Sequence, residues 1–375
     1  MVSMVPMHRP PSTSPETAAR TPAPAERGGF LLATCQGGAE ATLCQRQEAI
    51  LPGMTKAAWR RGVVTFRLGG PKPAGQPADV APDVLDPPDD FFPDLVYART
   101  VLRSLGQVAG ASDPERITAL RGLVAHPHWD NVHVWCRDPR LEVDVVSIRA
   151  GLLGAYGKPA GLAAAARPGD LVLDCLIDAP DRWWVGWHRA GTAMSCQPGG
   201  LHPIELPADK VSRAWLKLDE AIATFGLALQ RGQRAIELGA SPGGACQRLL
   251  EAGLRVVGID PALVDERVSA HPSFEQWRMR TRDVKLRNFR GVDWIVADMN
   301  IDPRSTLESI GRIVTAAGVR PAGIVATLKL PDWTRAAELP EWLDRFREWG
   351  FVPRARQLST GGREVCVAAL RTGRR

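Results

Sequence analysis

Residues 235–261 read AIELGASPGGACQRLLEAGLRVVGIDP, and this stretch decides the fold of the C-terminal half of the chain. It begins as an apolar strand, passes through a glycine-rich turn into a helix, and returns to a second apolar strand that ends at Asp260. Strands and helices that alternate in this way pack as a parallel, doubly wound sheet. The alternation continues to the C-terminus, so we predict a Rossmann-like α/β domain over residues 201–375.

The glycine-rich turn, Gly239 to Gly244, favours a ligand at the start of the following helix. Glycines there allow the backbone to approach a ligand closely at a helix N-terminus. A dinucleotide fingerprint needs Gly-x-Gly-x-x-Gly, but Ser241 replaces the second glycine, which weakens the interpretation as an NAD site. Asp260, at the end of the next strand, can accept hydrogen bonds from the ribose diol of either NAD or S-adenosylmethionine. A tight turn without a ligand is the alternative.

Four charged residues of the same half stand near the ends of apolar strand-like runs or, for Lys217, in a helix just upstream. They are Lys217 in SRAWLKLDEA, Asp298 in DWIVADM, Lys329 in IVATLKLP and Glu364 in GGREVCVAAL. The strands of an α/β domain would aim these side chains at one place. Taken singly, each has a simpler role: Lys217 and Glu364 as surface charges, Asp298 as a strand-end cap, and Lys329 as a lysine with a buried stem. Lys329 interrupts an apolar run, however, where a buried charge needs a reason.

A Lys/Asp/Lys/Glu set is suited to methyl transfer onto a ribose hydroxyl. The hydroxyl is a poor nucleophile, so a base must hold or remove its proton as the new bond forms. A lysine can do this if nearby positive charge or burial lowers its pKa. We predict that Lys217 and the apolar surroundings lower the pKa of Lys329 from its reference value near ~10.4. Asp298 and Glu364 would orient the ammonium groups.

These motifs resemble those of the FtsJ-type ribose 2′-O-methyltransferases, which carry a Lys-Asp-Lys-Glu tetrad. The similarity is greatest to the bacterial branch that methylates a cytidine ribose in large-subunit ribosomal RNA. It extends over about residues 205–370 and is weaker over 29–200. The segments that carry it are SRAWLKLDEA (212–221), LGASPGG (238–244), DWIVADMNIDP (293–303), LKLP (328–331) and REVCV (363–367).

This resemblance implies the site residues and the cofactor, S-adenosylmethionine. The implied catalytic residues are Lys217, Asp298, Lys329 as the base, and Glu364. The implied cofactor contacts are Gly239, Pro242, Gly243, Gly244, Asp260, Asp283 near the adenine, and Asp298. The family usually has a tryptophan after the paired glycines, whereas this chain has Ala245. Loss of an aromatic contact would weaken cofactor binding by roughly 1 kcal/mol or more.

The resemblance also implies an N-terminal ferredoxin-like domain and a THUMP RNA-binding domain. The composition and the apolar pattern divide the chain into a disordered Pro/Ala/Ser/Thr-rich tail (1–28), a small strand–helix–strand unit (29–70), a Pro/Asp-rich linker (71–93), a second α+β block (94–200) and the α/β domain (201–375). The resemblance implies that the first unit is ferredoxin-like, that the second block is THUMP-like and that the last domain is the methyltransferase. Within the THUMP-like block we predict a helix over LVYARTVLRSLG (95–106) and strands over NVHVWC (131–136), DLVLDCLID (170–178) and RWWVGWHRAG (182–191).

Composition favours a cytoplasmic protein with a polyanionic partner. The formal net charge is +6, which favours RNA modestly. The seven cysteines include no Cys-x-x-Cys pair, which argues against a zinc ribbon or a secreted disulfide framework. Neither an apolar signal core nor a run of the ~20 apolar residues needed for a membrane span is present. The oligomeric state is not indicated.

Several other residues have two interpretations. We predict that His126, His128 and His133 lie at the surface or in turns and bind no metal. The tryptophans Trp183, Trp184 and Trp187 either pack in the core or stack on bases, with packing favoured. Cys246 and Cys366 are expected in the core, and a basic run contacts phosphates or forms a solvated face. The members of that run are Arg278, Arg280, Arg282, Lys285, Arg287 and Arg290.

Two functions compete with RNA ribose methylation. One is a non-catalytic RNA-binding protein with a vestigial methyltransferase fold, for which Ala245 is the best evidence. The other is an NAD-dependent oxidoreductase, which is disfavoured by Ser241 and by the absence of an acid/base motif for hydride transfer.

Overall fold

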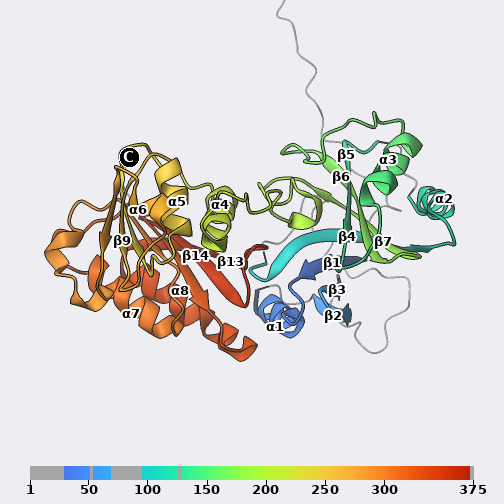
Figure 1. The fold of residues 1–375 in the computed structure, drawn as a ribbon. Helices are drawn as coiled ribbons and strands as arrows, with labels where there is room; N and C mark the ends of the chain where they lie inside the picture. The colour runs from blue at the N-terminus through green and yellow to red at the C-terminus, as the bar shows by residue number, and fades with distance from the viewer. Residues whose placement is uncertain (1–28, 51–53, 69–94, 125–127, 372–375) are drawn as a thin grey trace, which may run out of the picture.

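The computed structural model describes residues 29–50, 54–68, 95–124 and 128–371, which form two seven-stranded sheets. We call them the front sheet, in the order β2-β3-β1-β4-β7-β6-β5, and the back sheet, in the order β10-β9-β8-β11-β12-β14-β13. The two sheets lie side by side in Figure 1. The predicted tail (1–28) and linker (71–93) fall outside the described residues.

The front sheet is built from both predicted front domains. Its strands are β1 (Phe30–Cys35), β2 (Thr55–Arg60), β3 (Val63–Arg67), β4 (Ala98–Ala109), β5 (Asn131–Cys136), β6 (Leu171–Ala179) and β7 (Arg182–Arg189). Its helices are α1 (Glu40–Ile50), α2 (Asp113–Leu123) and α3 (Val145–Ala155), followed by the short 3-10 helix η2 (Pro198–Gly200). All neighbouring strands are antiparallel except β5 and β6. The antiparallel pair β1 and β4 joins the strands of the two predicted front domains in one sheet.

The helix predicted over residues 95–106 is wrong, because most of that segment belongs to strand β4. Ala98, Thr100 and Leu102 are buried while Arg99 and Val101 are partly exposed, which is the period of two expected of a strand. One edge of β4 pairs with β1 and the other with β7. Pairing on both edges therefore outweighs the local helical pattern.

The front sheet is strongly curved. Leu32 on β1 and Val63 on β3 share one apolar cluster with Trp135 on β5 and Leu176 on β6, although β3 and β5 are separated by four strands in the sheet order. The opposite face packs against α2 and α3, and there Trp183 and Trp187 are fully buried. Packing is thus confirmed for those two tryptophans, and Trp184 is partly buried against the inner cluster.

The back sheet has the predicted doubly wound α/β fold. Its strands are β8 (Arg234–Leu238), β9 (Arg255–Ile259), β10 (Phe274–Trp277), β11 (Trp294–Ala297), β12 (Gly323–Lys329), β13 (Phe351–Arg356) and β14 (Glu364–Arg371). The first five are parallel in the order 3-2-1-4-5 by chain position, as in Rossmann-like folds. Strand β14 inserts between β12 and β13, antiparallel to both.

Helices cover both faces of the back sheet (Figure 1). They are α4 (Arg213–Phe225), α5 (Gly244–Glu251), α6 (Glu266–Ser269), α7 (Pro303–Val314) and α8 (Leu339–Glu348), with 3-10 turns η3 (Thr281–Asp283), η4 (Leu286–Phe289) and η5 (Trp333–Glu338). Every helix in the described segments is too short or too polar to cross a lipid bilayer.

The two sheets share a core. We call the described residues up to 200 the front part and those from 201 onward the back part. One apolar cluster contains Leu31 and Tyr97 from the front part together with Leu339 and Trp342 from the back part. The ring of Tyr97 lies edge-on to that of Trp333, with centroids 6.5 Å apart. Hydrogen bonds also connect the two sheets, because the Arg356 guanidinium at the end of β13 donates to the carbonyls of Ala98 and Arg99 on β4 at 3.1 Å. The front part is therefore held firmly against the back sheet.

Candidate active site at the strand ends of the back sheet

The four predicted catalytic side chains come from four elements that converge at one edge of the back sheet. Asp298 follows β11 directly, and Lys329 is the last residue of the neighbouring parallel strand β12. Glu364 begins β14 and is the register partner of Lys329. Helix α4 contributes Lys217 from the other side of this edge.

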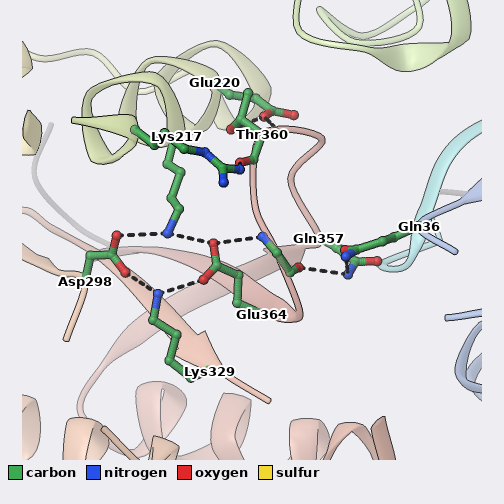
Figure 2. A network of polar contacts seen from close by, with 10 residues as sticks. Gln36, Lys217, Glu220, Asp298, Lys329, Gln357, Thr360 and Glu364 are labelled. Carbon is green, nitrogen blue, oxygen red and sulfur yellow. Dashed lines mark hydrogen bonds and ion pairs between the residues drawn. The ribbon is translucent and has the colours of Figure 1, made fainter. Parts of the chain in front are cut away.

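These four side chains form a closed ring of alternating charge (Figure 2). Lys217 Nζ lies 3.1 Å from Asp298 Oδ2 and 2.9 Å from Glu364 Oε1. Lys329 Nζ lies 2.7 Å from Asp298 Oδ1 and 2.7 Å from Glu364 Oε2. Each carboxylate therefore bridges both ammonium groups, and the ring as a whole is neutral.

The ring changes the expected protonation of Lys329. Burial lowers the pKa of Lys329, but the carboxylates of Asp298 and Glu364 raise it more, so it lies above its usual value. The predicted depression of this pKa is therefore wrong for this arrangement, because two carboxylates contact the amine directly and the contact with Lys217 is indirect. Burial raises the pKa of Asp298, but the two lysines lower it by a larger amount. The pKa of Asp298 therefore lies below its usual value.

The glycine turn lies beside the ring and is fixed by its backbone. Gly239 adopts φ +80°, and a Cβ at this position would lie 2.8 Å from the Cγ of Met299, so a side chain would be both strained and crowded. The next strand holds the turn, because Ser241 N donates to Asp260 Oδ2 at 3.2 Å. Ala262 N donates to the other oxygen of Asp260 at 2.8 Å. The carboxylate at the end of β9 is thus held in place against the turn.

Two cavities meet at this turn and share Gly239, Ser241 and Asp298. The first, of about 400 Å³, lies above the ring and is also lined by Lys217 and Glu364. The second, of about 620 Å³, extends past the end of β9 toward the turn η3. The two cavities therefore adjoin each other along the strand ends.

The residues predicted to contact a cofactor are distributed unevenly over these cavities. Asp260 lines the larger cavity, and Pro242 and Gly244 line the smaller one. Asp283 lies next to Arg282, which lines the larger cavity, but its own exposed carboxylate is not part of either lining. Gly243 is also absent from both linings, and it adopts φ +115° within the turn. The assignment of this set to a cofactor stays a prediction.

Glu237 is a site residue that the sequence interpretation missed. It lies inside β8, where it reads as part of an apolar strand, yet its carboxylate lines the smaller cavity. Burial raises its pKa to about 8. Its Oε2 is buried without a hydrogen-bond partner. An acidic residue inside a buried strand, two positions before the glycine turn, is the signal that could have identified it.

The loop between β13 and β14 ties the ring to the rest of the molecule (Figure 2). Ser359 N and Thr360 N donate to the buried carboxylate of Glu220 at 2.7 and 2.8 Å. Glu220 stands one turn after Lys217 on α4. At the start of the loop, Gln357 Nε2 donates to Gln36 Oε1 in the front part at 2.7 Å. The loop leading into Glu364 is thus held by α4 and by the front part.

Ala245, the departure from the family pattern, points into the core. It is buried in the cluster that joins α4, α5 and the back sheet, and it does not belong to the lining of either cavity. The expected loss of an aromatic contact therefore concerns a position that does not face the site. Cys246 and Cys366 are buried in the same cluster, as predicted.

The prediction that His133 lies at the surface or in a turn is wrong. It stands in β5 and is fully buried, because both faces of the curved front sheet are covered. Among the described residues, His133, Asp174 and His188 form the single group close enough to share a metal ion, with ligand atoms within 4.8 Å of one another. Both ring nitrogens of His188 already have partners, Asp174 Oδ2 at 2.5 Å and the Ser195 carbonyl at 2.7 Å. We therefore interpret Asp174 and His188 as a structural pair. His126 lies outside the described residues.

The basic run of the back part is exposed along its whole length. All six side chains lie on or near the turns η3 and η4, on the surface beyond β10. Arg280 and Arg282 line the rim of the larger cavity. This position is compatible with phosphate contacts and with a solvated face alike.

Known proteins were compared with the chain. Residues 210–330 match the model of the FtsJ-like methyltransferase family. The chain is 28% identical over 346 residues to "Ribosomal RNA large subunit methyltransferase M" of Thauera aminoaromatica. The aligned region covers 88% of this chain and 91% of that protein. The protein of the same name from Xylella fastidiosa (strain 9a5c) is 29% identical over 298 residues, which are 75% of this chain and 82% of that protein.

These matches confirm the resemblance seen in the sequence: the chain carries an FtsJ-like methyltransferase domain. The matched segment includes Lys217, Asp298 and Lys329 and ends before Glu364. The names of the two relatives agree with the predicted bacterial large-subunit branch.

Proposed function

We propose that the protein transfers a methyl group from S-adenosylmethionine to the 2′-hydroxyl of a ribose in structured RNA, namely a cytidine of large-subunit ribosomal RNA. The observation that carries the proposal is the charge ring of Lys217, Asp298, Lys329 and Glu364, which lies under one cavity at the carboxyl ends of the sheet. The FtsJ-like match and the relatives named for ribosomal RNA support it.

The two cavities offer the chemistry that S-adenosylmethionine requires. The Asp260 carboxylate at the larger cavity would accept hydrogen bonds from the ribose diol. The Glu237 carboxylate at the smaller cavity, whose Oε2 has no hydrogen-bond partner, would pair with a positive group, such as the ammonium of the methionine portion. When bound, the cofactor supplies an electrophilic methyl group and a positive sulfonium.

Lys329 would receive the proton of the ribose hydroxyl. Asp298 and Glu364 hold its amine at 2.7 Å each, which fixes the position of the nitrogen. The same contacts favour the ammonium form, so only a small neutral fraction is expected at neutral pH. Positive charge brought into the site would favour loss of a proton from Lys329. Lys217, held by the same two carboxylates, would stabilise the oxygen as negative charge develops on it.

The front part would hold the RNA. We propose that residues 29–70 form the ferredoxin-like unit and residues 94–200 the THUMP-like domain of this family, with contacts to RNA shape and phosphates. A ribosomal RNA substrate would place the enzyme in the bacterial cytoplasm. The rival proposal of a vestigial, non-catalytic domain relied on Ala245, and the buried position of this residue removes that support.

The test is methyl transfer by the purified full-length chain. We expect radiolabelled methyl from S-adenosylmethionine to appear on large-subunit ribosomal RNA taken from cells that lack the gene. Mapping by mass spectrometry should place it on one ribose. Asp260→Ala should weaken binding of S-adenosylhomocysteine in calorimetry.

Three outcomes would contradict the proposal. Methyl found on a base would contradict the ribose assignment, and RNA binding without transfer would support the non-catalytic rival. Equal affinity of S-adenosylhomocysteine for the Asp260→Ala variant and the unchanged protein would place the cofactor elsewhere.

A further inference from the structure

Three arginines of the front part converge on one buried carboxylate, Asp178. Arg60 Nη1 lies 2.7 Å from Asp178 Oδ2, Arg137 Nε lies 2.6 Å from Oδ1, and Arg182 Nη2 lies 2.9 Å from Oδ2. The Asp178 side chain is 0% exposed, whereas those of Arg60 and Arg182 are 47% and 37% exposed. We call Arg60, Arg137 and Arg182 the arginine cluster.

The cluster forms where the two ends of the curved front sheet meet. Arg60 ends β2 at one edge of the sheet, and Arg137 follows β5 at the other edge. Asp178 stands at a register shift between β6 and β7, where an extra residue can redirect a side chain. Arg137 also donates to the Arg61 carbonyl at 2.9 Å and so crosses the seam between the ends of the sheet.

The charges of the cluster do not balance. Three guanidinium groups contact one carboxylate, so two positive charges are left over at a partly exposed site. One carboxylate would be enough to join the ends of the sheet. Guanidinium groups gathered around a shared anchor are preorganised for a further anion, and their planar donors match phosphate oxygens.

We propose that the arginine cluster binds a phosphodiester group of the RNA substrate. This inference rests on the proposed function and names a site at which the RNA backbone is held. Its charge, its arginine composition and its location on the RNA-binding part of the chain favour a nucleic acid phosphate over an acidic peptide.

A chain of contacts connects the cluster with the active site. Arg137 touches Arg61, and a Cβ at Gly37 would lie 2.8 Å from Arg61 Nε. The neighbouring residue, Gln36, accepts the hydrogen bond from Gln357 at the start of the loop that leads to Glu364. An RNA strand held by the cluster would therefore be fixed relative to the ring, because the connecting segments are packed together.

The test compares charge-neutral and charge-conserving variants of the two exposed members. In Arg60→Gln/Arg182→Gln, RNA affinity should fall about tenfold at 0.1 M salt, and the slope of log K against log salt should shrink by about 1 to 2. The KM for RNA should rise while kcat at saturating RNA and the affinity for S-adenosylhomocysteine stay unchanged. Arg60→Lys/Arg182→Lys keeps the charge and should retain most of the salt slope while losing part of the affinity.

A matched control removes the same charge elsewhere. Arg345→Gln/Arg347→Gln acts on exposed helix α8, where each arginine pairs with a carboxylate on its own helix. This control should leave the salt slope within error of the unchanged protein. Thermal melts of all variants exclude unfolding as the cause, and inorganic phosphate added as a competitor separates an isolated anion site from one that needs RNA.

The inference is overturned if the cluster variant loses no more RNA affinity than the α8 control, or if its salt slope is unchanged. An equal loss in the Gln and Lys variants, accompanied by a lower melting temperature, would assign the cluster a purely structural role. Failure of the proposed function looks different, since the unchanged protein would then bind RNA without transferring methyl groups.

Discussion

The back and front sheets use charged residues in opposite ways. In the back sheet, charges gather at one edge formed by strand ends, where Lys217, Asp298, Lys329 and Glu364 close a ring beside two cavities. In the front sheet, charges lie within the strands and under the curved faces, as with Asp174. We infer that the first arrangement serves chemistry, and that buried charge in the second mainly serves the shape of the sheet. Substitutions in each sheet test this difference in role.

The largest expected effect lies in the ring. Lys329→Ala should lower methyl transfer by about two to four orders of magnitude, the range for a positioned base. Lys329→Arg should be about as inactive, because guanidinium keeps its proton near neutral pH. Single-turnover transfer measures both variants, and calorimetry should find S-adenosylhomocysteine affinity nearly unchanged. Substantial activity in the arginine variant would leave Lys329 only a positioning role.

The matching test in the front sheet concerns stability. His188→Ala removes the partner of buried Asp174, which should lower the free energy of unfolding by about 3 kcal/mol. Equilibrium urea denaturation measures the change, and activity at a permissive temperature should persist. If this variant instead lost activity without losing stability, the proposed division between the two sheets would not hold.

A third prediction concerns Glu237, the buried carboxylate of the back sheet. Glu237→Gln should weaken S-adenosylhomocysteine binding by about 10- to 100-fold, as expected for a lost hydrogen bond to a charged group. In the unchanged protein, burial raises the pKa of Glu237 to about 8, so this group must lose a proton before it can pair with a cation. Affinity should rise with pH and level off above about pH 8. A flat profile in calorimetry would exclude Glu237 as the partner of the ammonium.

The protonation of Lys329 leads to a fourth prediction. The carboxylates hold its pKa above the usual value, so the neutral amine becomes more abundant as pH rises toward that pKa. The rate should therefore climb by up to about tenfold per pH unit between pH ~7 and ~9. A rate that is constant over this range in buffers of matched ionic strength would mean that proton transfer to Lys329 does not limit turnover.

The smallest effect is expected at Glu220, which holds the loop before Glu364. Glu220→Gln cannot accept from both Ser359 N and Thr360 N as the carboxylate does, and kcat should fall about three- to tenfold, or roughly 1 kcal/mol for a hydrogen bond. The KM for cofactor should not change. Glu251→Gln is the control. The Glu251 carboxylate on α5 accepts a hydrogen bond from Trp215 on α4, the helix that carries Glu220, but it does not hold the loop between β13 and β14.

The convergence of Asp298 and Lys329 was predictable from the sequence because parallel strands bring their carboxyl ends together, and the antiparallel strand β14 brings its first residue, Glu364, to the same edge. Asp298, Lys329 and Glu364 each stand at a strand end in the printed sequence. Glu237 was missed because one acidic residue in an apolar strand looks like a local exception. The raised pKa of Lys329 depends on which charges touch it, and that required distances.

The front sheet was harder to predict because its contacts depend on curvature. Strand β4 has a local helical pattern that pairing on both edges overrides. His133 follows a turn-like stretch, so burial on both faces of the sheet was not evident from its neighbours. Arg60 and Asp178 are far apart in the sequence and meet only because the ends of the sheet approach each other.

The position of β14 has a consequence for synthesis of the chain. This strand fills the gap between β12 and β13, and it brings Glu364 to the ring. Until the ribosome has made residues 364–371, two lysines share one carboxylate and β12 keeps an unpaired edge, which is prone to wrong pairing. The growing chain therefore completes the charge ring and pairs this edge of β12 in the same step.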